Sequence, residues 1–123
     1  MMEPLQLSQT VMDGYSARIL MGTFTRAASA LELSRQFGIP IAACYRRVKE
    51  LEGLGLVYCE HGELARNGRG ILLYRSRLKS VRIAFEDGKL RARVELASMD
   101  LASAPENTVS EQVMNLRDPS STA

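Results

Sequence analysis

The sequence lacks tryptophan, and only three Phe and four Tyr supply its aromatic side chains. The core must therefore be built mainly from aliphatic side chains. No run approaches the roughly 20 apolar residues that a membrane-spanning helix needs, so a helical membrane protein is not expected. The N-terminal residues have neither the basic start nor the apolar stretch of a secretory signal peptide. We therefore expect a cytoplasmic protein with no membrane partner.

Cysteine and histidine are also scarce, with only Cys44, Cys59 and His61. Two separated thiols do not make a disulfide framework, and one histidine with two cysteines falls short of a structural zinc pattern. No carboxylate pair, nucleophile with a base, or phosphate-binding glycine loop can be assembled from the remaining residues. We therefore expect no metal, no cofactor and no enzymatic activity.

The charges are distributed unevenly along the chain, although the net charge is only +2. Residues 16–93 carry 15 Lys and Arg against 7 Asp and Glu, whereas the segments on either side are acidic. A basic middle favours binding to a polyanion, and solvated surface charge is the plain alternative.

Three helices are predicted before the strands begin. Leu7, Val11, Tyr15 and Ile19 form one apolar stripe, which Gly14 either weakens or splits into two helices. The residues Thr23-Phe24-Thr25 are expected to form a short extended link. A second helix begins with the capping box Ser29-Ala-Leu-Glu32 and ends at Gly38, a residue that readily takes the left-handed conformation.

The third predicted helix runs from Pro40 to about Leu54, after a very short turn. Its apolar positions share one face, and its polar positions share the opposite face. The apolar face consists of Cys44, Val48 and Leu51, and the opposite face of Ala42, Tyr45, Arg46 and Lys49.

Two pairs of strands follow. The segments 56–59 and 71–74 flank a polar, glycine-rich loop, and the segments 81–85 and 90–96 flank Asp87-Gly88. Asp-Gly favours a two-residue hairpin, which aligns Phe85 with Leu90. The same register aligns Ile83 with Ala92 and Val81 with Val94, and it points Arg82, Arg91 and Arg93 to the other face.

This order of elements predicts an α+β fold, a winged helix-turn-helix with a three-helix core, a β-wing and an extra C-terminal β-hairpin. The stretch from Ser29 to Val57 resembles the core of arsenic-repressor-like winged-helix regulators, most closely the small archaeal type. The ending Lys-Glu-Leu-Glu-Gly-Leu-Gly-Leu-Val is its most specific part. The resemblance covers about residues 15–77 and implies a DNA-binding regulator. The metal-sensing members carry a cysteine pair in a helix of this domain, which this sequence lacks, so metal regulation is not implied.

The chemistry of the predicted recognition helix, residues 40–54, suits the major groove of duplex DNA. Arg46 can bond guanine through two atoms, Tyr45 can contact a phosphate or a thymine methyl, and Ala42 permits close approach. We expect Lys49 to act with them and Arg47 to contact phosphate from the flank. At the wing, residues 60–70, Arg66 and Arg69 are expected on the backbone or in the minor groove. A solvated helix face and a charged hairpin tip are the respective alternatives.

The expected function is therefore sequence-specific DNA binding by a transcriptional regulator. The alternatives are a winged helix that binds protein without DNA, and binding to RNA. Residues 1–77 are expected to form the DNA-binding domain, 78–96 a hairpin that packs on it or dimerises, and 97–123 a flexible tail. We expect a homodimer whose leading interface is the Val81–Leu96 hairpin, with Val11 and Tyr15 on the first helix as the competing surface. The sequence does not identify an effector.

Overall fold

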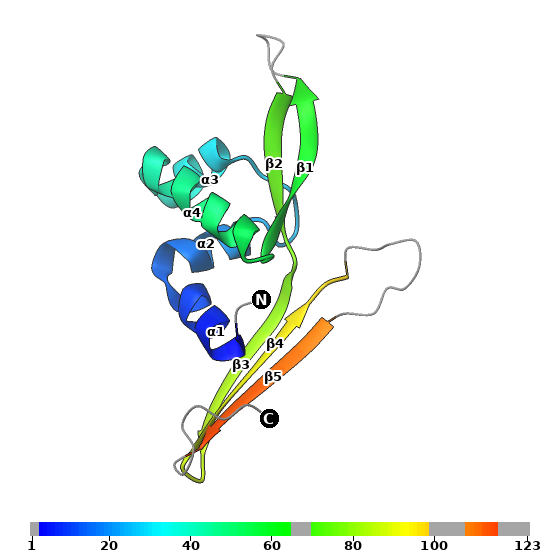
Figure 1. The fold of residues 1–123 in the computed structure, drawn as a ribbon. Coiled ribbons are helices and arrows are strands. Elements are labelled where there is room, and N and C mark those ends of the chain that lie inside the picture. The colour runs from blue at the N-terminus through cyan, green and yellow to red at the C-terminus, as the bar shows by residue number, and fades with distance from the viewer. Residues whose placement is uncertain (1–2, 65–69, 99–107, 116–123) are drawn as a thin grey trace. The chain divides into compact units, whose positions relative to one another are not determined.

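A computed structural model describes residues 3–64, 70–98 and 108–115, and it confirms the α+β class. Its helices and strands form two compact units (Figure 1). One unit comprises the residues from Asp13 to Arg77, and the other combines the residues up to Met12 with those from Leu78 on. No helix among the described residues is long and apolar enough to cross a membrane.

The unit Asp13–Arg77 contains three helices and a two-stranded ribbon. They are α2 (Gly14–Gly22), α3 (Ala30–Phe37), α4 (Ile41–Gly53), β1 (Val57–Leu64) and β2 (Gly70–Ser76). The first predicted stripe is indeed split into two helices, but the break lies at Asp13, one residue before Gly14. Asp13 takes an extended conformation, and its side chain accepts from the backbone N–H of Ser16 as the N-cap of α2. Thr23 and its neighbours form turns, so the prediction of an extended link there was wrong.

The junction between α3 and α4 follows the sequence signals closely. Ser29 and Glu32 form both hydrogen bonds of the capping box. Gly38 takes the left-handed conformation, with φ of 66°, and its N–H donates to the carbonyl of Ser34. Ile39 is buried in the turn and α4 begins two residues later. The two helices are therefore joined by a turn of only three residues, Gly38 to Pro40.

The core of this unit is aliphatic, as the lack of tryptophan predicts. The side chains buried almost completely come from all three helices and from the ribbon, and they include Ile19, Leu33, Ile39, Val48, Leu51, Leu56 and Val57. The ribbon is tied to the helices by an isolated bridge, in which Ala28 and Tyr74 exchange two backbone hydrogen bonds of 3.0 and 2.8 Å. The segment before α3 thus lies beside β2 and fixes the ribbon against the helices.

Gly22, the last residue of α2, offers a test of this packing. A Cβ at Gly22 would lie 2.6 Å from Phe37 Cε2 and 2.9 Å from Leu33 Cδ2. Overpacking costs about 1–3 kcal/mol, and the better helix propensity of alanine returns about 1 kcal/mol. We expect Gly22→Ala to lower the free energy of unfolding by about 1 kcal/mol. The control Gly14→Ala, whose Cβ would meet nothing within 4 Å, should not lower it. Urea denaturation curves of the two variants that coincide would contradict this packing.

The second unit contains α1 (Pro4–Met12) and a three-stranded antiparallel sheet in the order β3 (Leu78–Glu86), β4 (Lys89–Leu96), β5 (Thr108–Asn115). The predicted hairpin register is confirmed: Phe85 pairs with Leu90, Ile83 with Ala92, and Val81 with Val94. Asp87 and Gly88 both have positive φ, 52° and 70°, as the two-residue turn requires.

The prediction of a flexible tail over residues 97–123 was wrong for residues 108–115, because these form β5. The strand pairs with β4 along its whole length, from Leu96 opposite Thr108 to Lys89 opposite Asn115. Gln112 is buried, its Oε1 accepts from the backbone N–H of Leu5, and its Nε2 donates to Glu3. Pairing with a distant strand, which leaves no local signal, overrides the polar composition of this segment.

The prediction that residues 1–77 form one domain was also wrong at its start. Helix α1 packs against β4 and β5, where Ala92, Val94 and Leu96 are buried (Figure 1). The hairpin therefore buries the β4 part of its apolar face within its own unit. Val11 lies in α1 and Tyr15 in α2, so the prediction that they share one first helix was wrong.

Candidate nucleic-acid interface

Helix α4 has one buried face and one exposed face, in the positions that the sequence predicts. Cys44, Val48 and Leu51 are at most 1% exposed and anchor the helix to the core. The opposite row, which comprises Ala42, Tyr45, Arg46 and Lys49, is exposed. Because three consecutive turns are anchored, the exposed side chains project from a fixed scaffold.

Arg46 and Tyr45 are the most available polar groups of this row. Tyr45 is 52% exposed, and Arg46 is exposed and forms no ion pair with any part of the chain that the structure describes. The N-cap residue of α4 is Pro40, which gives no side-chain hydrogen bond to the first N–H groups of the helix. The positive end of the helix dipole therefore lies beside the exposed Ala42.

Lys49 lies on the side of the exposed row that faces the ribbon. Its Nζ is 5.8 Å from the centroid of the Tyr74 ring and 3.4 Å from a carboxylate oxygen of Glu52. The interaction with the Tyr74 side chain, and after it that with Glu52, raises the pKa of Lys49. Lys49 is therefore charged, but it already has partners within the unit.

Arg47 has a role that its flanking position in the sequence did not reveal. Its side chain is 28% exposed and forms ion pairs with Asp13 at 3.5 Å and with Glu50 at 3.2 Å. Since Asp13 is the N-cap of α2, the guanidinium connects α4 to the beginning of α2. Arg47 thus helps to hold the exposed face of α4 in place, a role that follows only from the tertiary contact with Asp13.

The charged N-cap at Asp13 predicts that the free energy of unfolding depends on pH. The backbone N–H of Ser16, and less strongly the Arg47 guanidinium, lower the pKa of Asp13 below its ordinary value of 3.8. We expect Asp13→Ala to lower the free energy of unfolding by about 1 kcal/mol at neutral pH, the usual effect of losing an N-cap. A depressed carboxyl pKa stabilises the fold above the unfolded-state value, and this stabilisation is lost as pH falls through the folded-state pKa. The difference between the two proteins should therefore shrink below about pH 4; a constant difference in thermal melts from pH 7 to pH 3 would contradict the charged cap.

The β1–β2 ribbon extends beyond the helices of its unit (Figure 1). Cys59 pairs with Tyr74 and Val57 with Ser76, so the base of the ribbon is regular. Beside it, Arg75 lies 4.0 Å from Glu60, whose carboxylate accepts from the Tyr58 hydroxyl. Arg66 and Arg69, the predicted wing contacts, lie outside the described residues, and their role stays a prediction.

The cysteines do not assemble into a site. Cys44 is buried, its Sγ donates to the carbonyl of Ala30 at 3.3 Å, and burial raises the pKa of its thiol. Cys59 is partly exposed in β1. Among the residues that the structure describes, no three His, Cys, Asp or Glu side chains are grouped closely enough to hold a metal ion.

Comparisons of the chain with family models, with curated proteins and with solved structures gave no match. The geometry of α3, α4 and the ribbon is therefore the basis on which a function can be proposed.

Proposed function

We propose that this protein is a winged helix-turn-helix regulator that binds duplex DNA, with α4 as its recognition helix. The observation that carries the proposal is Arg46: an exposed guanidinium without an ion pair in the described chain, on a helix whose other face is completely buried. A guanidinium in this position can bond O6 and N7 of guanine, which is the commonest specific contact of proteins with bases.

The neighbours of Arg46 fit the same role. Ala42, one turn earlier, is small enough to let the helix approach the floor of the groove, and Tyr45 offers a hydroxyl to a phosphate or a base edge. The uncapped beginning of α4 adds N–H groups that favour a phosphate. Helix α3 and the tight turn at Gly38 hold α4 at its buried face, which leaves the whole opposite face to a groove.

The electrostatics of the exposed row favour nucleic acid over an acidic or apolar protein surface. The exposed face presents the cations Arg46 and Lys49, which attract a polyanion, and lysine is depleted at protein–protein interfaces. We further propose that the protein acts as a homodimer, because one recognition helix reads few base pairs and a two-fold dimer matches a palindromic site.

The proposal is tested by selecting bound sequences from a random duplex pool and measuring their affinity by fluorescence anisotropy. We expect a palindromic consensus, and a weakening of at least about tenfold between 50 and 200 mM salt, which corresponds to about two neutralised phosphates. Single-stranded RNA of the same length is the comparison. No duplex binding at 50 mM salt, or equal binding to duplex DNA and RNA without sequence preference, would overturn the proposal.

A further inference from the structure

Strand β3 is an edge strand, and within the described chain no strand pairs with its outer side. The register shift between Leu78 and Ser80 hinders pairing with another strand only at the beginning of this edge. From Val81 to Glu86 the strand pairs regularly with β4, and its outer edge is a template for another strand.

The apolar face of the sheet is uncovered at the same end of β3. Ile83 is 45% exposed and Phe85 is 76% exposed, whereas Ala92 and Val94 on the same face are buried. Helix α1 therefore covers only part of this face. The exposed part lies on the edge strand, where the side chains of an added strand can pack beside it.

The opposite face of β3 carries charges that the unit does not balance. Arg82 lies directly opposite Arg93, and like charges in that relation are unfavourable. Glu111 on β5 balances the positive charges of β4. It lies opposite Arg93, and its Oε1 is 3.8 Å from Nε of Arg91. Arg82 and Glu86 form no ion pair with any described residue. Glu86 lies opposite Lys89 beside the hairpin turn but forms no ion pair with it. The edge strand thus presents a cation, Arg82, that faces a like charge, and an anion, Glu86, four residues further along the same face.

We propose that β3 pairs with β3 of a second copy of this chain, antiparallel and centred on Ala84. In this register Arg82 lies opposite the partner's Glu86, and Phe85 lies opposite the partner's Ile83. The two-fold axis produces each contact twice. Two charge pairs form on one face of the resulting six-stranded sheet, and two aromatic–aliphatic pairs form on the other. The contacts of this interface are independent of the proposed function. Only its biological purpose, the supply of a two-fold dimer, rests on that proposal.

Other antiparallel registers of the two β3 strands bring mismatched side chains opposite each other. A shift by one residue would place the apolar face of one copy beside the charged face of the other. A centre at Ile83 puts Arg82 opposite the partner's Ala84 and leaves both charges unbalanced. A centre at Arg82 places two arginines opposite each other. Within β3, the centre at Ala84 is the register that balances both charges and joins the apolar faces.

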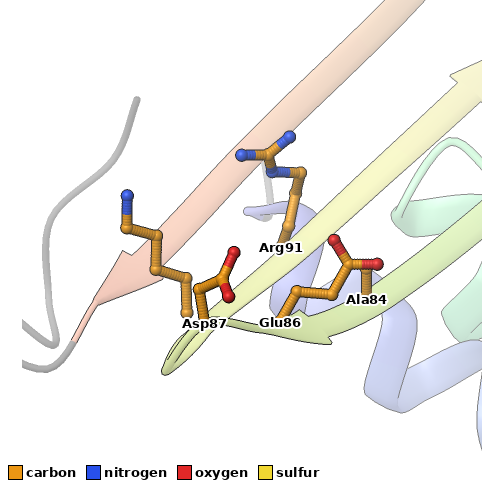
Figure 2. A pocket seen from close by; sticks show the side chains of 5 residues that line it. Ala84, Glu86, Asp87 and Arg91 are labelled. Carbon is orange, nitrogen blue, oxygen red and sulfur yellow. The ribbon is translucent and has the colours of Figure 1, made fainter.

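The backbone supports the same register. In a two-residue hairpin the residues beside the turn, Glu86 and Lys89, form a hydrogen-bonded pair, so the N–H and C=O of Ile83 and Phe85 point to the outer edge. Phe85 opposite the partner's Ile83 is then a hydrogen-bonded pair, and Ala84 lies at a close, non-bonded position. Figure 2 shows that Ala84 is the smallest side chain lining a hollow with Glu86, Asp87 and Arg91. The small methyl at the axis leaves room for the two flanking charge pairs.

The experiment is a charge exchange in the full chain, read by light scattering and analytical ultracentrifugation. We expect the unmodified protein to be dimeric at micromolar concentration. Arg82→Glu and Glu86→Arg, each alone, should weaken the dimer at least tenfold, because each creates two like-charge pairs. The double variant Arg82→Glu with Glu86→Arg should regain most of the affinity. Arg93→Gln on the central strand is the matched control: it changes a charge on the same face without giving Arg82 an anionic partner in its own chain, and it should remain dimeric.

Three outcomes would overturn the interface: a monomeric unmodified protein, single variants that stay dimeric, or single variants whose dissociation the double variant does not reverse. Circular dichroism melts verify that each variant is folded, and the control and the double variant show whether the charge changes themselves are tolerated. Duplex binding is measured on the same samples. A dimer that behaves as expected but binds no DNA overturns the proposed function alone, whereas a monomer that binds a palindrome overturns this interface alone.

Discussion

Cutting the chain after Leu96 is expected to destabilise the unit formed by α1 and the sheet. The truncation removes β5 and with it eight cross-strand pairs to β4. It also removes Gln112, whose amide accepts from the N–H of Leu5 at the beginning of α1 and donates to Glu3. At about 0.2–1 kcal/mol for each favourable pair, the loss is about 2 kcal/mol or more. For a unit of this size, that corresponds to a fall in Tm of about 10 °C.

Two variants make this expectation specific. Cutting after Asn115 keeps β5 and should leave the melting temperature unchanged. Gln112→Ala keeps the strand but removes its buried contacts with α1, so we expect a smaller loss, about 1–2 kcal/mol. Hydrogen exchange followed by mass spectrometry should show faster exchange in β4 and α1 of the chain cut after Leu96. Unchanged exchange and melting in that chain would mean that β5 contributes nothing to stability.

Arg46→Ala is expected to lower the affinity for the selected duplex by about 1–3 kcal/mol, which is about 5- to 150-fold, and to relax the preference at one base pair. The physical reason is the loss of two parallel hydrogen bonds to guanine from a side chain that has no competing ion pair among the described residues. The fold should be unaffected, because Arg46 is exposed on the face opposite Cys44 and Val48. Anisotropy titrations against the consensus and against single-base variants measure both effects.

Arg46→Lys distinguishes base recognition from simple attraction to phosphate. Lysine keeps the positive charge but lacks the planar fork, so it should recover non-specific affinity and not the base preference. If Arg46→Lys binds like the unmodified protein, Arg46 contacts phosphate. Arg47→Ala provides a second comparison: its ion pairs to Asp13 and Glu50 predict a loss of stability that accompanies any loss of affinity.

Local signals in the sequence determined the elements whose residues interact with near neighbours. The capping box at Ser29, the left-handed Gly38 and the Asp87-Gly88 turn each act over two to four residues, so their geometry can be derived from residue types alone. The two faces of α4 also follow from periodicity, because burial of Cys44, Val48 and Leu51 is the only way for that stripe to leave water. The candidate recognition face was therefore available from the sequence.

Only the tertiary structure decided which distant segments meet. The strand Thr108–Asn115 has a polar composition and is separated from the end of β4 by eleven residues, so its pairing depends on the open edge that Lys89–Leu96 provides. The assignment of α1 to the sheet depends on the apolar patch of Ala92, Val94 and Leu96 that it covers, and the ion pair between Arg47 and Asp13 depends on how α2 packs against α4. Such contacts are selected by the surface that each folded element leaves exposed. That surface exists only after the elements have formed, and for this reason local residue patterns do not predict these contacts.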